Sequence, residues 1–331
     1  MTYPERQNTD LPKVTVVIPV RNEERYIDLF LNAVLKQDYP ADKMEIVVVE
    51  GASEDRTRQI LDEYAKRHDN MRVIDNPGKI VPKALNIGIK SAKGDIIMRM
   101  DAHASYPVDY VRKCAEYLDR TGADNVGGVC EHVGQGGLGE AIALALDCKF
   151  GLGGAKFRTA TKEQYVDTVF PGVWPRKTFE QCGYFNEKLA RNQDIEYNAR
   201  LRKKGGKILL NPEIRCFYYC RSNLKDLWKQ NFRIGFWNII TVRITPGSLS
   251  LRHFIPLIFV SSLLTSWLVP PLWLFIVSSY ILCNIFFSSK VAFKNGFRYL
   301  PVLPVIFLTL HISYGLGSLA GILGLWPGKK S

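Results

Sequence analysis

The sequence lacks the cysteine patterns that would indicate disulfide bonds or a zinc site. Its seven cysteines are scattered and form no CxxC pair, and Cys216 and Cys220 have no partners at zinc-site spacing. Free thiols in a reducing compartment are the simplest interpretation. The first ten residues, MTYPERQNTD, also lack the apolar core of a signal peptide. We therefore expect the first domain to stay in the cytoplasm.

Acidic residues are nearly missing from the last third of the chain. The whole chain has a net charge of +12. From Arg221 to Ser331, eleven Lys and Arg residues stand against one Asp, a net charge of +10. The longest apolar runs lie in the same part of the chain. Basic residues beside apolar runs favour an anionic membrane surface over nucleic acid, so we expect membrane lipids as a partner and no nucleic acid.

Two long runs in this part contain no acidic residue, Lys or Arg. Phe254–Phe287 has 34 residues and is interrupted by Pro270–Pro271, and Tyr299–Trp326 has 28. A single membrane span needs about 20 residues. The first run therefore fits either two crossings or a re-entrant hairpin, and the second fits one crossing. The number of spans, two or three, is left open.

The charges between and after these runs bear on orientation. Lys290, Lys294 and Arg298 follow the first run and belong in the cytoplasm by the positive-inside tendency. A last crossing would then leave Lys329 and Lys330 on the opposite side, which is a mild violation of the same tendency. We predict integral insertion in the cell inner membrane, with the first domain facing the cytoplasm.

A basic amphipathic helix is predicted just before the apolar runs. Within Asn223–Ile240, basic side chains recur every four residues and alternate with aromatic ones. Such a helix suits the membrane interface. The alternative is an ordinary helix packed on the domain.

The first hundred residues alternate between strand and helix patterns. Buried strands are predicted at Leu11–Val20, Glu45–Val49, Arg72–Asp75 and Asp95–Met100, and helices at Asn22–Gln37, Asp55–His68 and Val81–Ser91. This alternation is typical of an open parallel sheet with helices on both faces. Ligands of such sheets bind beyond the carboxyl ends of the strands.

Polar clusters follow three of these strands. They are residues 19–23 (PVRNE), 50–55 (EGASED) and 101–103 (DAH). In the first two, the polar residues could cap the next helix or contact a ligand. In the third, Asp101 and His103 could hold Mn²⁺ or Mg²⁺ and so neutralise a diphosphate. A simple turn with a locally satisfied His103 is an equal alternative.

A fourth cluster lies near the start of a later predicted helix. Asp194 follows Asn192 and Gln193 and precedes Ile195–Lys203. It could stabilise the helix dipole or act as a general base.

These segments together resemble family 2 glycosyltransferases. The motifs PVRNE, EGASEDRT, NP…PKALNIG, GDIIMRMDAH and NQDIEYNARLRKKGGKI occur here in the order found in that family. Within it, the chain resembles the bacterial exopolysaccharide type typified by the succinoglycan glucosyltransferase, in which DAH replaces the usual DxD. The resemblance covers about residues 11–245. It implies the GT-A fold: a Rossmann-like α/β architecture with a mixed, mostly parallel sheet flanked by helices, followed here by C-terminal transmembrane helices.

The resemblance also implies residue roles. Asp194 would be the catalytic base, and Asp101 with His103 would hold the metal. The donor nucleotide would be bound by Pro19, Arg21, Glu23, Glu50, Asp55, Lys83 and Asp101. Acceptor or diphosphate contacts are expected from Trp174, although a core position suits this tryptophan equally well, and from Gln230 and Arg233.

The sequence departs from the family pattern in three places. Glu50-Gly51 stands in place of a frequent Asp-Asp pair, which puts the choice of nucleobase in the donor in doubt. Gln193 occupies a position where Glu is common, although the base position itself is kept. Ile234 follows Arg233 where processive members have Trp, so processivity is not inferred.

The resulting prediction is an inverting, metal-dependent transfer of a sugar from a nucleotide-sugar, with UDP expected. The acceptor would be lipid-linked or a glycan, in cell-surface or exopolysaccharide biosynthesis. Expected domains are 1–220 (catalytic), 221–253 (interfacial helix) and 254–331 (membrane). The alternatives are a polyprenyl-phosphate sugar synthase, a processive synthase and a non-catalytic membrane scaffold. A transporter is disfavoured because the apolar runs lack acidic and basic residues.

Overall fold

The computed structural model describes residues 11–154, 158 and 160–325. The polar N-terminus, Trp326 and the two C-terminal lysines of the sequence predictions lie outside these ranges. The chain divides into two compact units. The first comprises residues up to 130 together with 160–218, and the second comprises 131–159 and 219 onward.

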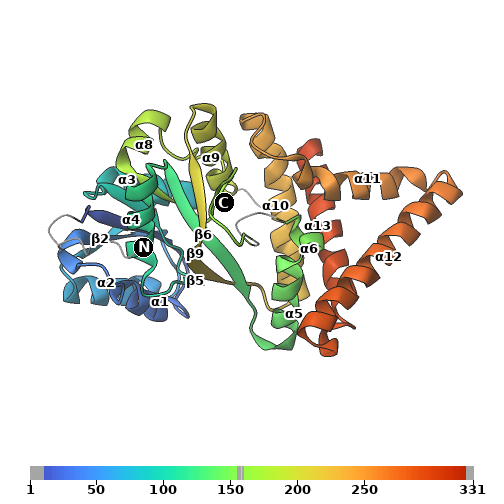
Figure 1. Ribbon diagram of the computed structural model, residues 1–331, viewed down its shortest axis with the longest axis horizontal. Helices are drawn as coiled ribbons and strands as arrows, with labels where there is room; N and C mark the ends of the chain where they lie inside the picture. The colour runs from blue at the N-terminus through green and yellow to red at the C-terminus, as the bar shows by residue number, and fades with distance from the viewer. Residues whose placement is uncertain (1–10, 155–157, 159, 326–331) are drawn as a thin grey trace. The chain divides into compact units, whose positions relative to one another are not determined.

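The first unit is built on a mixed sheet (Figure 1). Four parallel strands come first in the chain: β1 (Val14–Val20), β2 (Met44–Glu50), β3 (Met71–Asp75) and β4 (Ile96–Arg99). Their spatial order is β3-β2-β1-β4. β1 and β2 are buried along almost their whole length, which explains their continuous runs of β-branched residues.

The sheet continues beyond β4 with antiparallel neighbours in the order β8-β6-β9-β5. These are β8 (Val173–Pro175), β6 (Asn125–Val133), β9 (Ile208–Tyr219) and β5 (Ala104–Ser105), and β7 (Gln164–Tyr165) pairs with β9. The mixed α/β architecture is confirmed. Antiparallel pairings make up a larger share of it than the sequence predicts.

The helices of the first unit follow the strands in the predicted order. They are α1 (Ile27–Leu35), α2 (Thr57–Arg67), α3 (Val81–Ser91), α4 (Tyr110–Thr121), α8 (Arg176–Cys182) and α9 (Gln193–Lys203), and a short 3₁₀ turn, η2 (Ala41–Lys43), precedes β2. α3 comes close to the sheet at Gly88. A Cβ atom there would lie 2.3 Å from Val17 Cγ1 of β1.

The second unit is helical. Its helices are α5 (Gly136–Asp147), α6 (Lys149–Leu152), α10 (Leu224–Ile244), α11 (Ile255–Ser266), α12 (Pro270–Asn295) and α13 (Leu303–Leu323), with 3₁₀ turns η3 (Leu251–Phe254) and η4 (Phe297–Tyr299). Among the described residues, α12 and α13 are long and apolar enough to cross a membrane.

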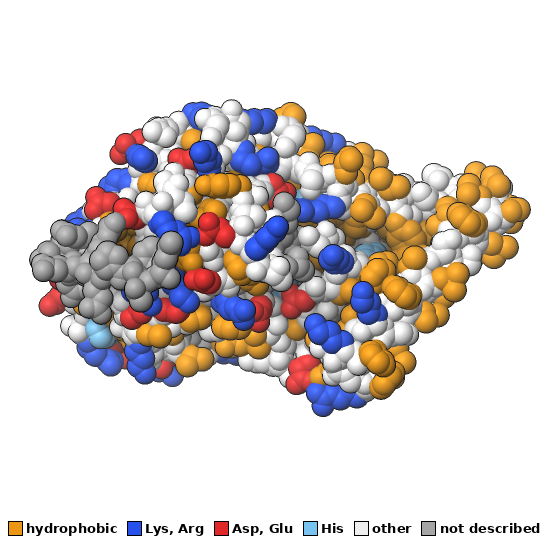
Figure 2. Space-filling view, in the orientation of Figure 1, with side chains coloured by type: hydrophobic (Ala, Val, Ile, Leu, Met, Phe, Trp, Pro, Cys, Tyr) orange, Lys and Arg blue, Asp and Glu red, His pale blue; other side chains and the backbone are white. Residues whose placement is uncertain are grey.

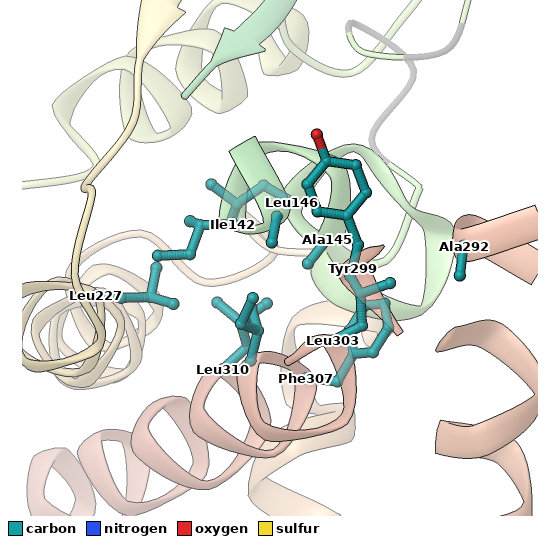
Figure 3. Packing of buried hydrophobic residues seen from close by; sticks show 11 residues of the cluster. Ile142, Ala145, Leu146, Leu227, Ala292, Tyr299, Leu303, Phe307 and Leu310 are labelled. Atoms are coloured by element: carbon teal, nitrogen blue, oxygen red, sulfur yellow. The ribbon is translucent and has the colours of Figure 1, made fainter. Parts of the chain in front are cut away.

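A hydrophobic core of the second unit joins helices far apart in the sequence (Figure 3). It contains Leu303, Ile306, Phe307 and Leu310 from the first half of α13, together with Ala141, Ile142, Ala145 and Leu146 of α5, and Leu227, Ala292 and Tyr299. α10 is therefore not a free surface helix. Its apolar side packs inside this unit, which favours the packed-helix alternative, while its Lys225, Lys229 and Arg233 are exposed.

The close approach of α3 to β1 gives a test of the fold. We expect Gly88→Ala to lower the free energy of unfolding by about 1–3 kcal/mol, because the added methyl group overpacks a buried strand. Thermal or denaturant unfolding of the purified chain measures the loss.

Gly137→Ala is the matched control, since a Cβ at Gly137 meets nothing within 4 Å. This variant should be neutral or slightly stabilising. Equal effects of the two substitutions would contradict the close packing of α3 on β1.

Candidate active site

The carboxyl ends of the parallel strands bring the predicted polar clusters to one edge of the sheet. Val20, the last residue of β1, is in register with Glu50, the last residue of β2. β4 pairs with β1 on the other side and ends at Arg99. The loops that carry Arg21, Glu23, Asp55, Asp101 and His103 therefore all leave the sheet at this edge.

Side-chain hydrogen bonds lock the first two loops together. The backbone N–H of Asn22 donates to Ser53 Oγ at 2.9 Å, and the N–H of Glu54 donates to Asn22 Oδ1 at 2.9 Å. The N–H of Glu23 donates to Thr57 Oγ1 at 2.8 Å. These reciprocal bonds fix the two strand-to-helix turns against each other.

Glu50 and Asp55, both predicted to contact the nucleotide, are engaged within these turns. Glu50 is buried, and its carboxylate accepts from the N–H groups of Ser53 (2.6 Å) and Ala52 (3.1 Å). Asp55 accepts from the N–H of Thr57 at 3.0 Å. Loss of water around Asp55 would raise its pKa, but the hydrogen bonds from Thr57 outweigh this and lower it. Both carboxylates therefore shape the loops, and their contact with a nucleotide stays a prediction.

The loop after β3 carries the predicted donor residue Lys83. Asn76 organises it, because its Oδ1 accepts from the N–H of Gly78 and its side-chain amide donates to the carbonyl of Ile80. Lys83 lies in the first turn of α3 and is half-buried. Its stem covers Gly78, where a Cβ would lie 2.2 Å from Lys83 Cδ. Pro19, also predicted to line the pocket, lies near the end of β1 and is partly buried.

The end of β4 holds a buried ion pair. Arg99 Nε donates to Asp101 Oδ1 at 2.9 Å, and Arg99 Nη2 donates to Asp101 Oδ2 at 3.0 Å. The two side chains are only 8% and 4% exposed. The guanidinium also lies over the ring of Phe170, 5.0 Å from its centroid. Within the described part of the chain, the buried Arg99 Nη1 has no hydrogen-bond partner.

Arg99 was not predicted as a site residue. A signal was available, since a lone arginine inside the buried strand pattern DIIMRM needs a carboxylate partner. Burial would lower the pKa of Arg99, but the carboxylates of Asp101 and Asp194 raise it. The guanidinium therefore stays charged inside the protein.

His103 lies beside the first loop. Its Nδ1 is 3.5 Å from Glu23 Oε1, and its ring meets Tyr218 edge-on at a centroid distance of 5.0 Å. The side chain is 39% exposed. The predicted pocket residue Glu23 and the predicted metal ligand His103 are thus brought together.

Asp194 lies in the first turn of α9, which begins after Asn192 in the left-handed conformation (φ 61°). Burial raises the pKa of its carboxyl above the ordinary value. The Arg99 guanidinium opposes this rise, and the Asp101 carboxylate adds to it. Asp194 and Asp101, 93 positions apart in the sequence, are therefore close enough to interact through Arg99.

The burial of Trp174 favours the core alternative over a contact with an acceptor. Trp174 is 2% exposed and packs in the core against the rings of Phe179, Phe185 and Tyr197. As part of β8, it pairs with Ile97 of β4, which turns its side chain into the protein interior. Phe170, in the same FPGVW segment, is the aromatic residue beside Arg99.

Gln230 and Arg233 lie on α10 of the second unit, where Gln230 is partly buried and Arg233 exposed. Their expected contacts stay predictions. Within the described residues, no group of three or more His, Cys, Asp or Glu side chains could hold a metal by itself. A metal at Asp101 and His103 would therefore need further ligands from its substrate.

We expect Arg99→Met to lower the free energy of unfolding by about 3–5 kcal/mol, because it leaves the Asp101 carboxylate buried without its partner. Denaturant unfolding of the purified chain measures this effect. The double variant Arg99→Met with Asp101→Leu should regain most of the loss, since an apolar pair replaces the ion pair.

Arg67→Met is the matched control, because Arg67 forms an exposed pair with Glu63. It should cost less than about 1 kcal/mol. A loss for Arg99→Met as small as that of the control would show that the buried pair does not hold the end of β4.

Comparisons with known proteins agree with this architecture. Residues 15–174 match the model of "Glycosyl transferase family 2". Over 91% of its length, the chain is 28% identical to the dolichyl N-acetyl-alpha-D-glucosaminyl phosphate 3-beta-D-2,3-diacetamido-2,3-dideoxy-beta-D-glucuronosyltransferase of Methanococcus voltae, covering 95% of that protein. It is also 28% identical, over 91% of its length, to the succinoglycan biosynthesis protein ExoA of Rhizobium meliloti, covering 92% of it.

A solved structure shares the fold. The mannosyltransferase PcManGT from Pyrobaculum calidifontis, in complex with GDP-Man and Mn²⁺, superposes with a TM-score of 0.60 at 17% identity. The match covers 96% of this chain and 89% of that one.

Proposed function

The chain is a glycosyltransferase with a family 2 domain at residues 15–174, and we propose that it transfers a sugar with inversion from a nucleotide-sugar to a lipid-linked or glycan acceptor. One observation carries this proposal. Two carboxylates with different environments, Asp101 and Asp194, lie around the buried guanidinium of Arg99. Such a division of environments is typical of sites that assign different roles to two acidic groups.

Asp194 is proposed as the general base. Burial raises its pKa, which makes its carboxylate a stronger proton acceptor than an ordinary aspartate, and the Arg99 guanidinium opposes that rise. In the reaction, Asp194 takes the proton from the acceptor hydroxyl as that oxygen attacks the anomeric carbon. The bond from this carbon to the diphosphate oxygen breaks, and the nucleoside diphosphate leaves.

The burial of Asp101 and its hydrogen bonds to Arg99 support a single-displacement reaction. Its two oxygens are held by Arg99 and the side chain is 4% exposed, which leaves it poorly placed to attack a sugar carbon. With Asp194 as the base and the Asp101 carboxylate held by Arg99, we propose that the acceptor attacks directly and the anomeric configuration inverts. An α-linked donor would then give a β-glycoside.

The donor set fits Mn²⁺ or Mg²⁺ completed by substrate oxygens. Each Asp101 oxygen accepts one bond from Arg99 and keeps a further lone pair, and the partly exposed His103 supplies an imidazole nitrogen. Magnesium sites of this kind use one or two protein ligands plus phosphate oxygens. When bound, such a cation would offset the charge that develops on the departing diphosphate.

The donor and acceptor classes are also proposals. The locked loops of β1 and β2, with Arg21, Glu23, Glu50 and Asp55, together with Pro19 and Lys83, would bind the nucleotide, and UDP is proposed from the resemblance of their motifs. The Methanococcus voltae relative, named for transfer to a dolichyl phosphate-linked sugar, favours extension of a lipid-linked glycan over transfer onto polyprenyl phosphate itself. We propose that Gln230 and Arg233 contact the acceptor or the diphosphate.

Membrane lipids are the proposed third partner, and the cell inner membrane with the catalytic domain in the cytoplasm is the proposed location. The free state of all seven cysteines is consistent with a reducing compartment. The exposed Lys290, Lys294 and Arg298 support a cytoplasmic side by the positive-inside tendency.

We expect Asp194→Asn to reduce kcat by about 10²–10⁴-fold while donor binding stays near that of the unchanged chain, because only proton removal is lost. The unchanged enzyme should lose kcat as the pH falls through the pKa of Asp194, and this acid limb should lie above the range of an ordinary aspartate. Initial rates across pH, with nucleotide binding measured separately, check both statements.

Asp42→Asn, at an exposed aspartate on η2, is the control and should leave the rate and its pH dependence unchanged. Normal turnover by Asp194→Asn would remove Asp194 from the mechanism.

Detergent-purified chain offered a panel of UDP- and GDP-sugars with a lipid-linked acceptor should release one nucleoside diphosphate. Release should require Mn²⁺ or Mg²⁺ and stop with EDTA. Because the chain by itself supplies few ligands, Mn²⁺ binding followed by electron paramagnetic resonance should strengthen at least about tenfold when UDP or GDP is added.

Asp101→Ala should abolish this nucleotide-dependent increase. Tight Mn²⁺ binding without nucleotide would contradict the proposed donor set. Absence of release with every donor would favour a non-catalytic scaffold.

A further inference from the structure

The hairpin of α11 and α12 exposes a continuous set of large apolar side chains. Residues 254–289 contain no Asp, Glu, Lys or Arg. At the turn between the two helices, Trp267 and Leu268 are 65% and 72% exposed. Figure 2 shows hydrophobic side chains gathered over α11 and α12. The large apolar side chains that these two helices expose include Ile255, Ile258, Leu264, Leu274, Phe275, Leu282 and Phe286. An exposed apolar patch of this extent indicates a binding surface for a membrane or another protein.

One side of α12 packs against other helices of the second unit, and the opposite side is exposed. Tyr280 stacks on Phe259 of α11 at 4.4 Å between ring centroids. The side-chain amide of Asn284 donates to the carbonyl of Pro304 at 3.0 Å, and Phe287 stacks on Phe150 at 4.8 Å. These contacts join the two arms of the hairpin to each other and join α12 to α13 and α6.

α13 differs from α12 although its composition is as apolar. Half of its apolar stretch is buried, against 11% for α12. It runs parallel to α10 and touches it through small residues. A Cβ at Gly317 would lie 2.0 Å from the carbonyl oxygen of Phe232, and one at Gly235 would lie 2.1 Å from that of Tyr314. Further along, Arg243 Nη2 donates to the carbonyl of Ile322 at 2.8 Å.

This pairing argues against a crossing by α13. If α13 spanned the bilayer, α10 would lie in the hydrocarbon beside it, with its exposed Lys229, Arg233 and Arg243. Each such charge costs about 2.5–3.5 kcal/mol at a membrane centre on insertion scales. α13 is better explained as a core helix of the second unit.

The length of α11 limits how deep the hairpin can reach. Its 12 residues span roughly 18 Å, whereas the hydrocarbon core is about 30 Å thick. α12 is longer, but it diverges from α11 at their common turn (Figure 1), so the shorter arm sets the depth. Basic residues lie at both ends of the hairpin, away from its turn. Arg252 and His253 precede α11, and Lys290, Lys294 and Arg298 end the other arm.

We propose that the chain is anchored from one side only. The α11–α12 hairpin enters a single leaflet, its basic ends meet anionic headgroups, and α13 stays on the side from which the hairpin enters. This inference rests on the proposed membrane association and not on sugar transfer. It differs from the expected single crossing of the last apolar run and would remove the charge violation that this crossing implied.

Cysteine accessibility in membranes tests the topology. In the full chain with Cys283→Ser, single variants Leu29→Cys, Lys294→Cys, Leu325→Cys and Leu268→Cys would be treated with an impermeant maleimide in sealed vesicles of each orientation. All four positions are exposed in the structure. We expect Leu29→Cys, Lys294→Cys and Leu325→Cys to react from one common side, and Leu268→Cys to react only after denaturation. Reaction of Leu325→Cys from the opposite side, or of Leu268→Cys from either side, would overturn the proposal.

Vesicle flotation identifies what covers the hairpin. The double variant Trp267→Asp with Leu268→Asp should bind vesicles of phosphatidylcholine and phosphatidylglycerol about 100-fold or more weakly than the unchanged chain. Leu29→Asp, at an exposed leucine of the catalytic unit, should bind normally. Nucleoside diphosphate release should survive in both variants, which separates a failure of the anchor from a failure of the proposed activity.

Undiminished flotation of the double variant would overturn the proposal. If that variant instead lost a dimer seen by size-exclusion chromatography, the hairpin would be covered by a second copy of the chain.

Discussion

The buried guanidinium of Arg99 is the constraint on which the carboxyl edge of the parallel strands depends. It fixes the Asp101 carboxylate through two hydrogen bonds, lies over the ring of Phe170, and opposes the rise that burial causes in the pKa of Asp194. Without it, two carboxylates would share a poorly hydrated region, where like charges raise each other's pKa. A permanently charged arginine can serve both carboxylates, whereas a lysine could lose its proton on burial.

The loops after β1 and β2, at this edge, are held in place by hydrogen bonds to each other. Asn22 and Ala52 adopt left-handed backbone conformations, with φ of 55° and 53°, which side chains with a Cβ adopt only at a cost in free energy. The reciprocal bonds between the two loops, and the Glu50 carboxylate beneath the second, compensate for this strain. A site fixed before substrate arrives loses less entropy on binding.

The parallel half of the fold could be predicted because its signals are local. The β-branched runs of β1 and β2 and the helical pattern of α3 lie where the sequence expects them. The antiparallel strands are short or irregular, and their pairing depends on distant segments, as between Val126 and Val173. Trp174 shows the limit for the site. From the sequence alone, an aromatic residue in FPGVW could contact a sugar or lie in the hydrophobic core. The pairing of Trp174 with Ile97 of β4 is what favours the core position.

The apolar tail shows why hydropathy alone cannot define a membrane topology. α12 and α13 have similar apolar compositions, yet one is exposed and the other half-buried. What separates them is the neighbouring helix. α13 can be apolar because it lies in a protein core, where glycines at 235 and 317 let α10 approach closely. In the proposed topology, the charges of α10 keep that pair out of the hydrocarbon. The lipid-facing surface is then the hairpin, whose turn is uncharged and whose ends are basic.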